Sequence, residues 1–269
     1  MKKYSLLILF AAIAALAIAA TMVIQTTTGT DEYDLSEVLS ITFSSQGPTD
    51  YIAYYPYNGN ADDESGNGHH GNMFGVDLTA DRFGNPGSAM EFDGIDDYIE
   101  PILKLPIDGF PLSINLWVNT PGNAPGSYQT FYTSDYNDSY ALSYYGFRVM
   151  QRYDGNVRAY FAATSGHGDY ATRSVYTDAP LPANEWVMLS FIFESPDNMR
   201  IYFSGDEQST FIEGNQSLTT VRFSEALDRF GTDYRTADRP YFEGKLDDIR
   251  IYDRVLTDSE ILVLLDARN

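Results

Sequence analysis

The residues best suited to bind a ligand through oxygen atoms gather in the loop between positions 58 and 71. This segment reads Asn-Gly-Asn-Ala-Asp-Asp-Glu-Ser-Gly-Asn-Gly-His-His-Gly, so carboxylates, amides and glycines follow one another closely. Such side chains either bond to the backbone amides of their own turn or offer oxygens to a cation. Calcium takes about six to eight oxygen ligands, of which this loop supplies only a part. A turn-forming role and a metal-binding role are both open at this point.

A pair of carboxylates, Glu91 and Asp93, suggests a different chemistry, the hydrolysis of a glycosidic bond. The two acids stand two positions apart in Glu-Phe-Asp-Gly-Ile-Asp (91–96), which places them on one face of a strand. Glycoside hydrolases hold two carboxyl groups about 5–5.5 Å apart for retention, or about 6.5–9.5 Å apart for inversion. Asp93 and Gly94 are instead typical of a turn, and the three histidines lie in loops without the spacing of a zinc site or a triad. We therefore predict no catalytic residue and a protein that is not an enzyme.

Tyrosines in the middle of the chain suggest a third chemistry, stacking on sugar rings. A phenol ring is apolar on its faces and carries a hydroxyl that forms hydrogen bonds, so it suits saccharides. The alternative is that these rings fill or cover the core. As a group they are the predicted ligand-binding residues: Tyr128, Tyr132, Tyr136, Tyr140, Tyr144 and Tyr145.

The elements that must position these groups are short strands. The 269 residues include 21 Tyr, 16 Phe, 12 Pro and 21 Gly, and turns rich in Asn, Asp, Gly and Pro separate the apolar segments. This pattern predicts an all-β fold, a two-sheet antiparallel sandwich. Residues 186–193 are mostly apolar on both faces, which predicts a central strand between two covered layers.

One short helix is expected at the C-terminal end. Thr257 and Glu260 have the spacing of a capping box, and an apolar stripe follows them at Ile261, Leu262, Leu264 and Leu265. We expect this helix to pack on an edge of the sandwich.

Residues 1–30 are expected to form a hydrophobic leader helix that directs export. Lys2 and Lys3 precede an apolar run, and Ala17-Ile18-Ala19 fits the cleavage pattern of a signal peptide. The alternative is an uncleaved membrane tether through residues 4–24, because about 20 residues suffice to span a bilayer. Residues 31–50 would then be a linker or an edge strand, and residues 51–269 the domain. Both alternatives predict a secreted or cell-surface protein.

The composition excludes several classes of partner. A net charge of −21 makes nucleic acid and anionic membrane surfaces poor partners, because binding phosphate requires a basic face. The excess of acidic residues suits cation binding, and it equally suits solubility in a high-salt habitat. The chain has no cysteine, which excludes disulfides and thiol chemistry.

Four motifs in order resemble the laminin-G-like, concanavalin A-like lectin/glucanase domain family. They are Tyr-Asn-Gly-Asn-Ala-Asp-Asp-Glu-Ser-Gly-Asn-Gly (57–68), Asp-Arg-Phe-Gly-Asn-Pro (81–86), Phe-Asp-Gly-Ile-Asp-Asp-Tyr-Ile (92–99) and Phe-Glu-Gly-Lys-Leu-Asp-Asp-Ile-Arg-Ile-Tyr (242–252). A shorter match, Leu-Ser-Ile-Asn-Leu-Trp-Val, lies at 112–118. The resemblance implies a jelly-roll sandwich whose first and last motifs are neighbours.

The same resemblance implies a structural calcium ion. Asp63 stands at an aspartate of the first motif, Asn67 follows it in the loop, and Asp247 and Asp248 lie in the closing motif. These four residues are the predicted metal ligands. The alternative is that Asp63 caps its own turn and that the other two aspartates accept hydrogen bonds from the backbone.

Three functions follow as hypotheses. The first is a non-catalytic extracellular recognition domain that binds a glycan or a surface protein. The second is a structural subunit of a cell-surface filament, coat or matrix. The third is a glycoside hydrolase, which requires that Glu91→Gln abolish sugar release.

Overall fold

The computed structural model describes residues 21–26, 29–34, 47–102, 104–122, 128–134, 145–163, 172–223, 226–232 and 241–267. The chain divides into two compact units, Met1–Ser44 and Ser45–Asn269. In the first unit β1 (Thr21–Thr26) and β2 (Gly29–Asp34) form an antiparallel hairpin. These strands occupy residues that the sequence assigned to the end of the leader and the start of the linker. The rest of the expected leader, residues 1–20, lies outside the described residues.

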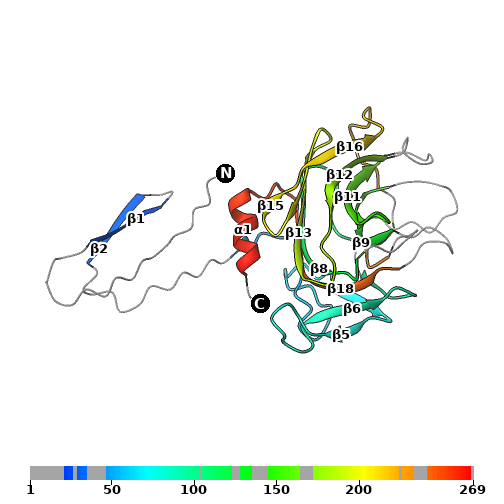
Figure 1. Ribbon diagram of the computed structural model, residues 1–269, viewed down its shortest axis with the longest axis horizontal. Helices are drawn as coiled ribbons and strands as arrows, with labels where there is room; N and C mark the ends of the chain where they lie inside the picture. Colours follow the sequence, from blue (N-terminus) through cyan, green and yellow to red (C-terminus); the bar gives the residue numbers. More distant parts are fainter. Residues whose placement is uncertain are drawn as a thin grey trace. The chain divides into compact units, whose positions relative to one another are not determined.

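The second unit is built from two antiparallel sheets that face each other (Figure 1). The first, called the β8 sheet, has the order β15-β14-β13-β8-β18-β6-β5, and β3 also pairs with β18. Its strands are β3 (Ala53–Tyr55), β5 (Asp77–Thr79), β6 (Ala89–Asp93), β8 (Leu112–Asn119), β13 (Val187–Ser195), β14 (Asn198–Phe203), β15 (Asp206–Glu207) and β18 (Glu243–Tyr252).

The second sheet, called the β10 sheet, has the order β16-β12-β11-β10-β9-β17-β7-β4. Its strands are β4 (Gly71–Phe74), β7 (Tyr98–Pro101), β9 (Gln129–Thr133), β10 (Phe147–Gln151), β11 (Asn156–Ala162), β12 (Thr172–Pro180), β16 (Thr210–Gly214) and β17 (Arg229–Phe230). The order in which the chain visits both sheets confirms the predicted jelly-roll sandwich.

The hydrophobic core lies between the sheets because alternate residues of each strand point inward. On β8, Leu116 and Val118 belong to this core, whereas Trp117 lies on the opposite face of the sheet. On β11, Val157, Ala159 and Phe161 face the core. The polar residues between them therefore face outward, which decides where a ligand can reach the sandwich.

The helix α1 (Asp258–Asp266) covers the outer face of the β8 sheet rather than an edge (Figure 1). Its Ile261 and Leu264 pack with Trp117, Met188 and other outward side chains of that sheet. This second apolar layer explains why both faces of β13 are apolar, as the sequence predicted. Thr257 and Glu260 form the predicted capping box. None of the helices in the described part of the chain has the length and apolar character needed to cross a membrane.

Candidate functional site

The loop around Asp63 is closed by hydrogen bonds from the protein itself. The Asp63 carboxylate accepts bonds from the backbone N–H of Tyr54 (3.0 Å), Ser65 (2.9 Å) and His69 (3.0 Å), and from the Ser65 hydroxyl (2.7 Å). Burial alone would raise the pKa of Asp63, but these bonds outweigh it and leave that pKa below its ordinary value. The Asn67 amide donates to the carbonyl of Ile52 at 3.0 Å. The side chain of Asp63 therefore organises its own turn.

Asp247 and Asp248 lie in a buried ionic cluster on β18. The Arg82 Nη1 atom lies 2.9 Å from Asp247 Oδ2 and 2.7 Å from Asp248 Oδ2. Asp248 Oδ1 accepts from Arg250 Nη2 (3.1 Å) and from the Tyr54 hydroxyl (3.0 Å). Burial, followed by the charge of Asp248, raises the pKa of Asp247, against the opposing effect of Arg82. Arg82 thus contacts both carboxylates, while Arg250 and Tyr54 bind Asp248 alone.

The predicted calcium ligands are neighbours but do not fit a common metal site. β3 pairs with β18, as expected, so the Tyr54 backbone binds Asp63 while its hydroxyl binds Asp248. Protein donors already hold both oxygens of Asp63, and Arg82 lies against Oδ2 of both Asp247 and Asp248. Asp247 Oδ1 is buried without a hydrogen-bond partner among the described residues, but one such oxygen falls short of the about six to eight that calcium takes. A bound calcium ion stays a prediction.

In the described part of the chain, a separate cluster of three aspartates brings its carboxylates close enough together to hold a metal ion. The ligand atoms of Asp93, Asp96 and Asp97 lie within 4.8 Å of one another. Asp97 Oδ2 accepts the backbone N–H of Asp93 at 2.8 Å, so this carboxylate also shapes its turn. Burial, together with the charges of Asp93, Asp96 and Asp77, raises the pKa of Asp97.

The predicted tyrosine cluster is only partly a surface feature. Tyr132 is fully buried and its hydroxyl donates to Asp228 at 2.8 Å, so its ring cannot stack on a sugar and its assignment to ligand binding was wrong. Tyr128 and Tyr145 are half-buried, and Tyr128 meets Tyr153 edge-on at a ring distance of 5.9 Å. Tyr136, Tyr140 and Tyr144 lie outside the described residues.

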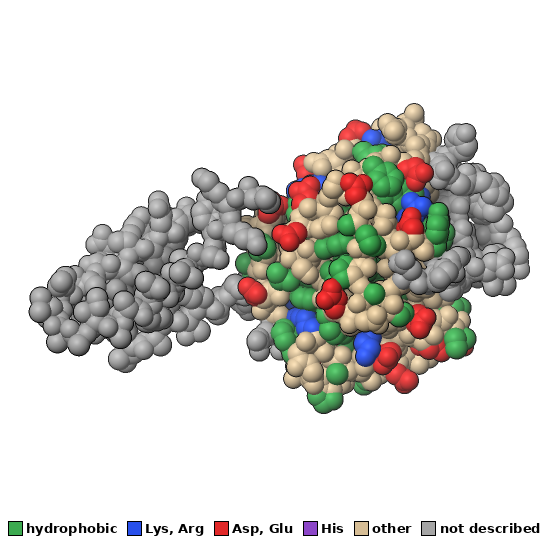
Figure 2. Space-filling view, viewed as in Figure 1, with side chains coloured by type: hydrophobic (Ala, Val, Ile, Leu, Met, Phe, Trp, Pro, Cys, Tyr) green, Lys and Arg blue, Asp and Glu red, His purple; other side chains and the backbone are tan. Residues whose placement is uncertain are grey.

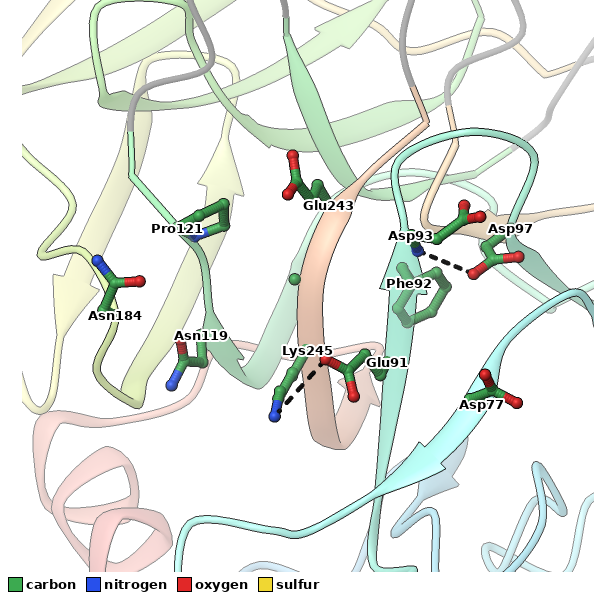
Figure 3. A pocket seen from close by; sticks show the side chains of 11 residues that line it. Asp77, Glu91, Phe92, Asp93, Asp97, Asn119, Pro121, Asn184, Glu243 and Lys245 are labelled. Atoms are coloured by element: carbon green, nitrogen blue, oxygen red, sulfur yellow. Dashed lines mark hydrogen bonds and ion pairs between the residues drawn. The ribbon is translucent and has the colours of Figure 1, made fainter.

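A cleft of about 430 Å³ opens on the outer side of the β8 sheet (Figure 3). We call it the rim cleft. Its centre is a cross-strand row formed by Asn119 of β8, Lys245 of β18 and Glu91 of β6, because Lys245 pairs with both neighbours. Asn184 stands on one side of the cleft in Figure 3 and Asp77 on the other. The complete lining is Asp77, Glu91, Phe92, Asp93, Asp97, Asn119, Pro121, Asn184, Glu243, Gly244 and Lys245.

Gly244 forms part of the lining where two strands approach closely. It has φ +141°, and a Cβ atom at this position would lie 2.4 Å from the carbonyl oxygen of Asn119 and 2.8 Å from the ring of Phe242. A larger residue would therefore push β18 away from β8 and deform the cleft.

The rim cleft offers hydrogen-bonding groups that donate, groups that accept and groups that do both. Amide side chains both donate and accept, carboxylates accept, and the Lys245 ammonium donates. Lys245 Nζ lies 3.7 Å from Glu91 Oε1 and 3.2 Å from Thr79 Oγ1, so the ammonium is held between two strands. Glu91 was considered from the sequence as a catalytic acid. In the structure its nearest charged partner is this lysine.

Sequence reasoning missed Asn119, Asn184 and Lys245. Asn119 directly follows the motif at 112–118, and Lys245 lies within the motif at 242–252. The alternation of side chains along β8 and β18 places both residues on the outer face of the sheet. Their meeting in one row depends on the register of β8, β18 and β6, which the sequence does not show.

Comparison with known proteins supports the fold. Residues 93–262 match the family model described as the concanavalin A-like lectin/glucanases superfamily. No curated protein matches the sequence.

Solved structures with this fold include domain 4 of AbnA, an extracellular arabinanase of family GH43 from Geobacillus stearothermophilus, in complex with arabinotriose. That match has 19% identity and a TM-score of 0.58 over 80% of this chain and 98% of the other. The botulinum neurotoxin serotype D ligand-binding domain with N-acetylneuraminic acid is 15% identical, with a TM-score of 0.58 over 81% and 51%. The binding domain of Paraclostridial Mosquitocidal Protein 1 is 15% identical, with a TM-score of 0.60 over 81% and 52%. The chain spans about half the length of these toxin chains.

Proposed function

Because this chain belongs to the concanavalin A-like lectin/glucanases superfamily, we propose that it is a non-catalytic extracellular domain that binds a neutral glycan in the rim cleft. The observation that carries the proposal is the row of Asn119, Lys245 and Glu91. It presents amide, ammonium and carboxylate groups side by side in an open cleft of about 430 Å³. Small-molecule sites in proteins are commonly clefts of roughly 300–1,000 Å³.

The charge of the rim cleft favours an uncharged saccharide. Five carboxylates line it against one lysine, so it repels anionic sugars and accepts hydrogen bonds from the hydroxyls of neutral ones. Similar structures support a binding role, since they include receptor-binding domains of toxins and an arabinanase domain in complex with arabinotriose. Export of the chain remains part of the proposal, whereas a calcium ion stays the prediction made from the sequence, which chelation tests.

The test is calorimetric titration with a panel of neutral oligosaccharides that includes arabinotriose. Asn119→Ala removes a hydrogen-bonding group and Glu91→Gln replaces a charged acceptor by a neutral amide. Each should weaken binding by about 1–2 kcal/mol, which is roughly fivefold to thirtyfold. Glu64→Gln is the matched control, since Glu64 is an exposed acid of the first loop and does not line the cleft.

Two results would contradict the proposal. One is a failure in the titrations: no oligosaccharide of the panel binds, or the control Glu64→Gln weakens binding as much as Asn119→Ala and Glu91→Gln do. The other is release of reducing sugars that Glu91→Gln abolishes, which would make the protein a hydrolase. A glycan array with and without calcium tests the metal, and concentration-dependent self-assembly without glycan binding would favour a structural subunit.

A further inference from the structure

A second group of polar and aromatic side chains occupies the outer face of the β10 sheet. Strand register places Arg158 beside Met150 of β10 and Tyr176 of β12, and places Tyr176 beside Phe211 of β16. The hairpin between β10 and β11 adds Arg152 and Tyr153 at one end. We call this surface the arginine–tyrosine face. Its accessible residues are Arg152, Tyr153, Arg158 and Phe211, and they lie on a buried layer of Arg148, Tyr160 and Tyr176.

The guanidinium of Arg158 is held in a fixed orientation. Its Nε and Nη2 atoms donate to the Ser174 hydroxyl at 3.1 and 2.6 Å, and Nη2 also donates to the Thr172 hydroxyl at 3.1 Å. Its Cζ lies 4.5 Å from the centre of the Tyr160 ring and 5.1 Å from that of Tyr176. Because neighbouring groups already orient it, binding a ligand would cost this side chain little entropy.

Within the part of the chain that the structure describes, no carboxylate forms an ion pair with Arg158; the neighbouring Glu213 instead forms a hydrogen bond with the hydroxyl of Tyr176. Its hydrogen-bond partners there are hydroxyls, and its Nη1 atom has none. Other arginines of this acidic protein have acidic partners, such as Arg254 with Asp50 and Glu260. Acidic side chains are spread over the face of the domain seen in Figure 2, so carboxylates are not scarce. A half-buried, oriented and unneutralised guanidinium is the group that binds a carboxylate from outside the protein.

A second arginine and two exposed rings lie near it. The Cζ atom of Arg152 lies 4.5 Å from the centre of the same Tyr176 ring, and its Nη2 atom forms an ion pair with Asp154 at 3.4 Å. Tyr153 is 46% exposed and Phe211 is 44% exposed. Exposed rings on a strand face suit the apolar face of a pyranose ring.

We propose that the arginine–tyrosine face is a second binding site, which takes a saccharide that carries a carboxylate, such as a uronic acid residue. Arg158 binds the carboxylate, and the exposed rings contact the sugar. This site lies on the β10 sheet and the rim cleft on the β8 sheet, so the two are independent. The cleft excludes acidic sugars by charge, whereas this face selects them. A saccharide fits better than an acidic peptide because the accessible rings of Tyr153 and Phe211 suit the apolar face of a sugar ring.

The experiment compares two probes that differ only in charge, trigalacturonic acid and galactotriose, by calorimetric titration of the full chain. We expect the acid to bind, and Arg158→Gln to weaken it about tenfold or more. Arg200→Gln is the matched control. It removes the same charge from an arginine of β14, outside the arginine–tyrosine face, that is paired with Glu194 and Asp258. It should leave the affinity for the acid within about twofold of the parent value.

Tyr153→Ala keeps the test decisive if Arg158→Gln does not fold, since an exposed ring can be removed without opening the core. It should also weaken binding of the acid, and Asn119→Ala in the rim cleft should not. Equal affinity for both probes, equal loss in Arg158→Gln and Arg200→Gln, or an unchanged affinity in Tyr153→Ala would overturn the proposal. If a hexaglutamate peptide binds as tightly as trigalacturonic acid, the inferred ligand would be an acidic peptide and the proposal of a saccharide would be overturned. If the protein binds no neutral glycan but still binds trigalacturonic acid, the rim-cleft proposal fails and the proposal for the arginine–tyrosine face stands.

Discussion

Replacing Asp247 and Asp248 one at a time should have very different effects on stability. Asp248 accepts hydrogen bonds from Arg250 and Tyr54 and lies 2.7 Å from an Arg82 nitrogen, all within the buried interior. Asp248→Asn leaves two buried guanidinium groups without an ionised partner that binds both. Breaking a buried pair in this way costs about 3–5 kcal/mol. For a domain of this size that is a fall in Tm of roughly 6–20 °C.

Asp247→Asn should cost only about 1 kcal/mol, because burial and the neighbouring Asp248 already favour the neutral form of Asp247. The carboxamide has nearly the same shape and can still accept a bond from Arg82. A raised pKa means that the folded protein binds more protons than the unfolded chain between the ordinary and the raised value. The free energy of unfolding therefore falls as pH rises through that interval, by at most about 1.4 kcal/mol per pH unit.

Thermal denaturation followed by circular dichroism between pH 5 and pH 9 tests both points. The parent protein should lose stability relative to Asp247→Asn as pH rises, since the variant lacks the titrating group. Equal losses in the two variants at pH 7 would refute the assignment of unequal roles. A difference between the parent and Asp247→Asn that does not change with pH would refute the raised pKa.

Three further predictions concern metal, cleft and helix. Chelation with EDTA should change the Tm by less than about 1 °C, because protein donors fill the Asp63 carboxylate and Arg82 lies against Asp247 and Asp248; a fall of several degrees would support the calcium site. Gly244→Ala should destabilise by at least about 3 kcal/mol, whereas Gly59→Ala, at φ +87° with open space around it, should cost about 1–2 kcal/mol. Similar midpoints in urea for the two would contradict the steric argument. Thr257→Ala should cost about 0.5–2 kcal/mol by removing the cap, and an unchanged midpoint would show that the capping box adds nothing.

The fold could be predicted because its signals are local and repeated. Alternating strands, turns and a capping box each follow from residues close together in the chain, and the four motifs added their order. The position of α1 could not be predicted in the same way. Its apolar stripe requires a partner surface, and the outward residues Trp117 and Met188 that provide it come from two distant strands.

The candidate site was harder to predict because it depends on register. Tyr132 and Tyr128 look alike in the sequence, yet Tyr132 lies in the core against Asp228 and Tyr128 lies near the surface. Asn119, Lys245 and Glu91 come from three strands that are far apart in the chain. Their hydrogen-bonding potential is ordinary until the sheet aligns them.

The residues that identify the family are, in this chain, those that hold its frame together. Asp63 closes the first loop, and Asp248 joins Tyr54 to two buried arginines. A carboxylate whose oxygens already accept protein donors cannot also bind a ligand without breaking those bonds. The binding that we propose therefore relies on residues with free donors and acceptors, such as Asn119 in the rim cleft and Arg158 on the arginine–tyrosine face. These residues can change without disturbing the frame, which is how one sandwich can carry different binding specificities.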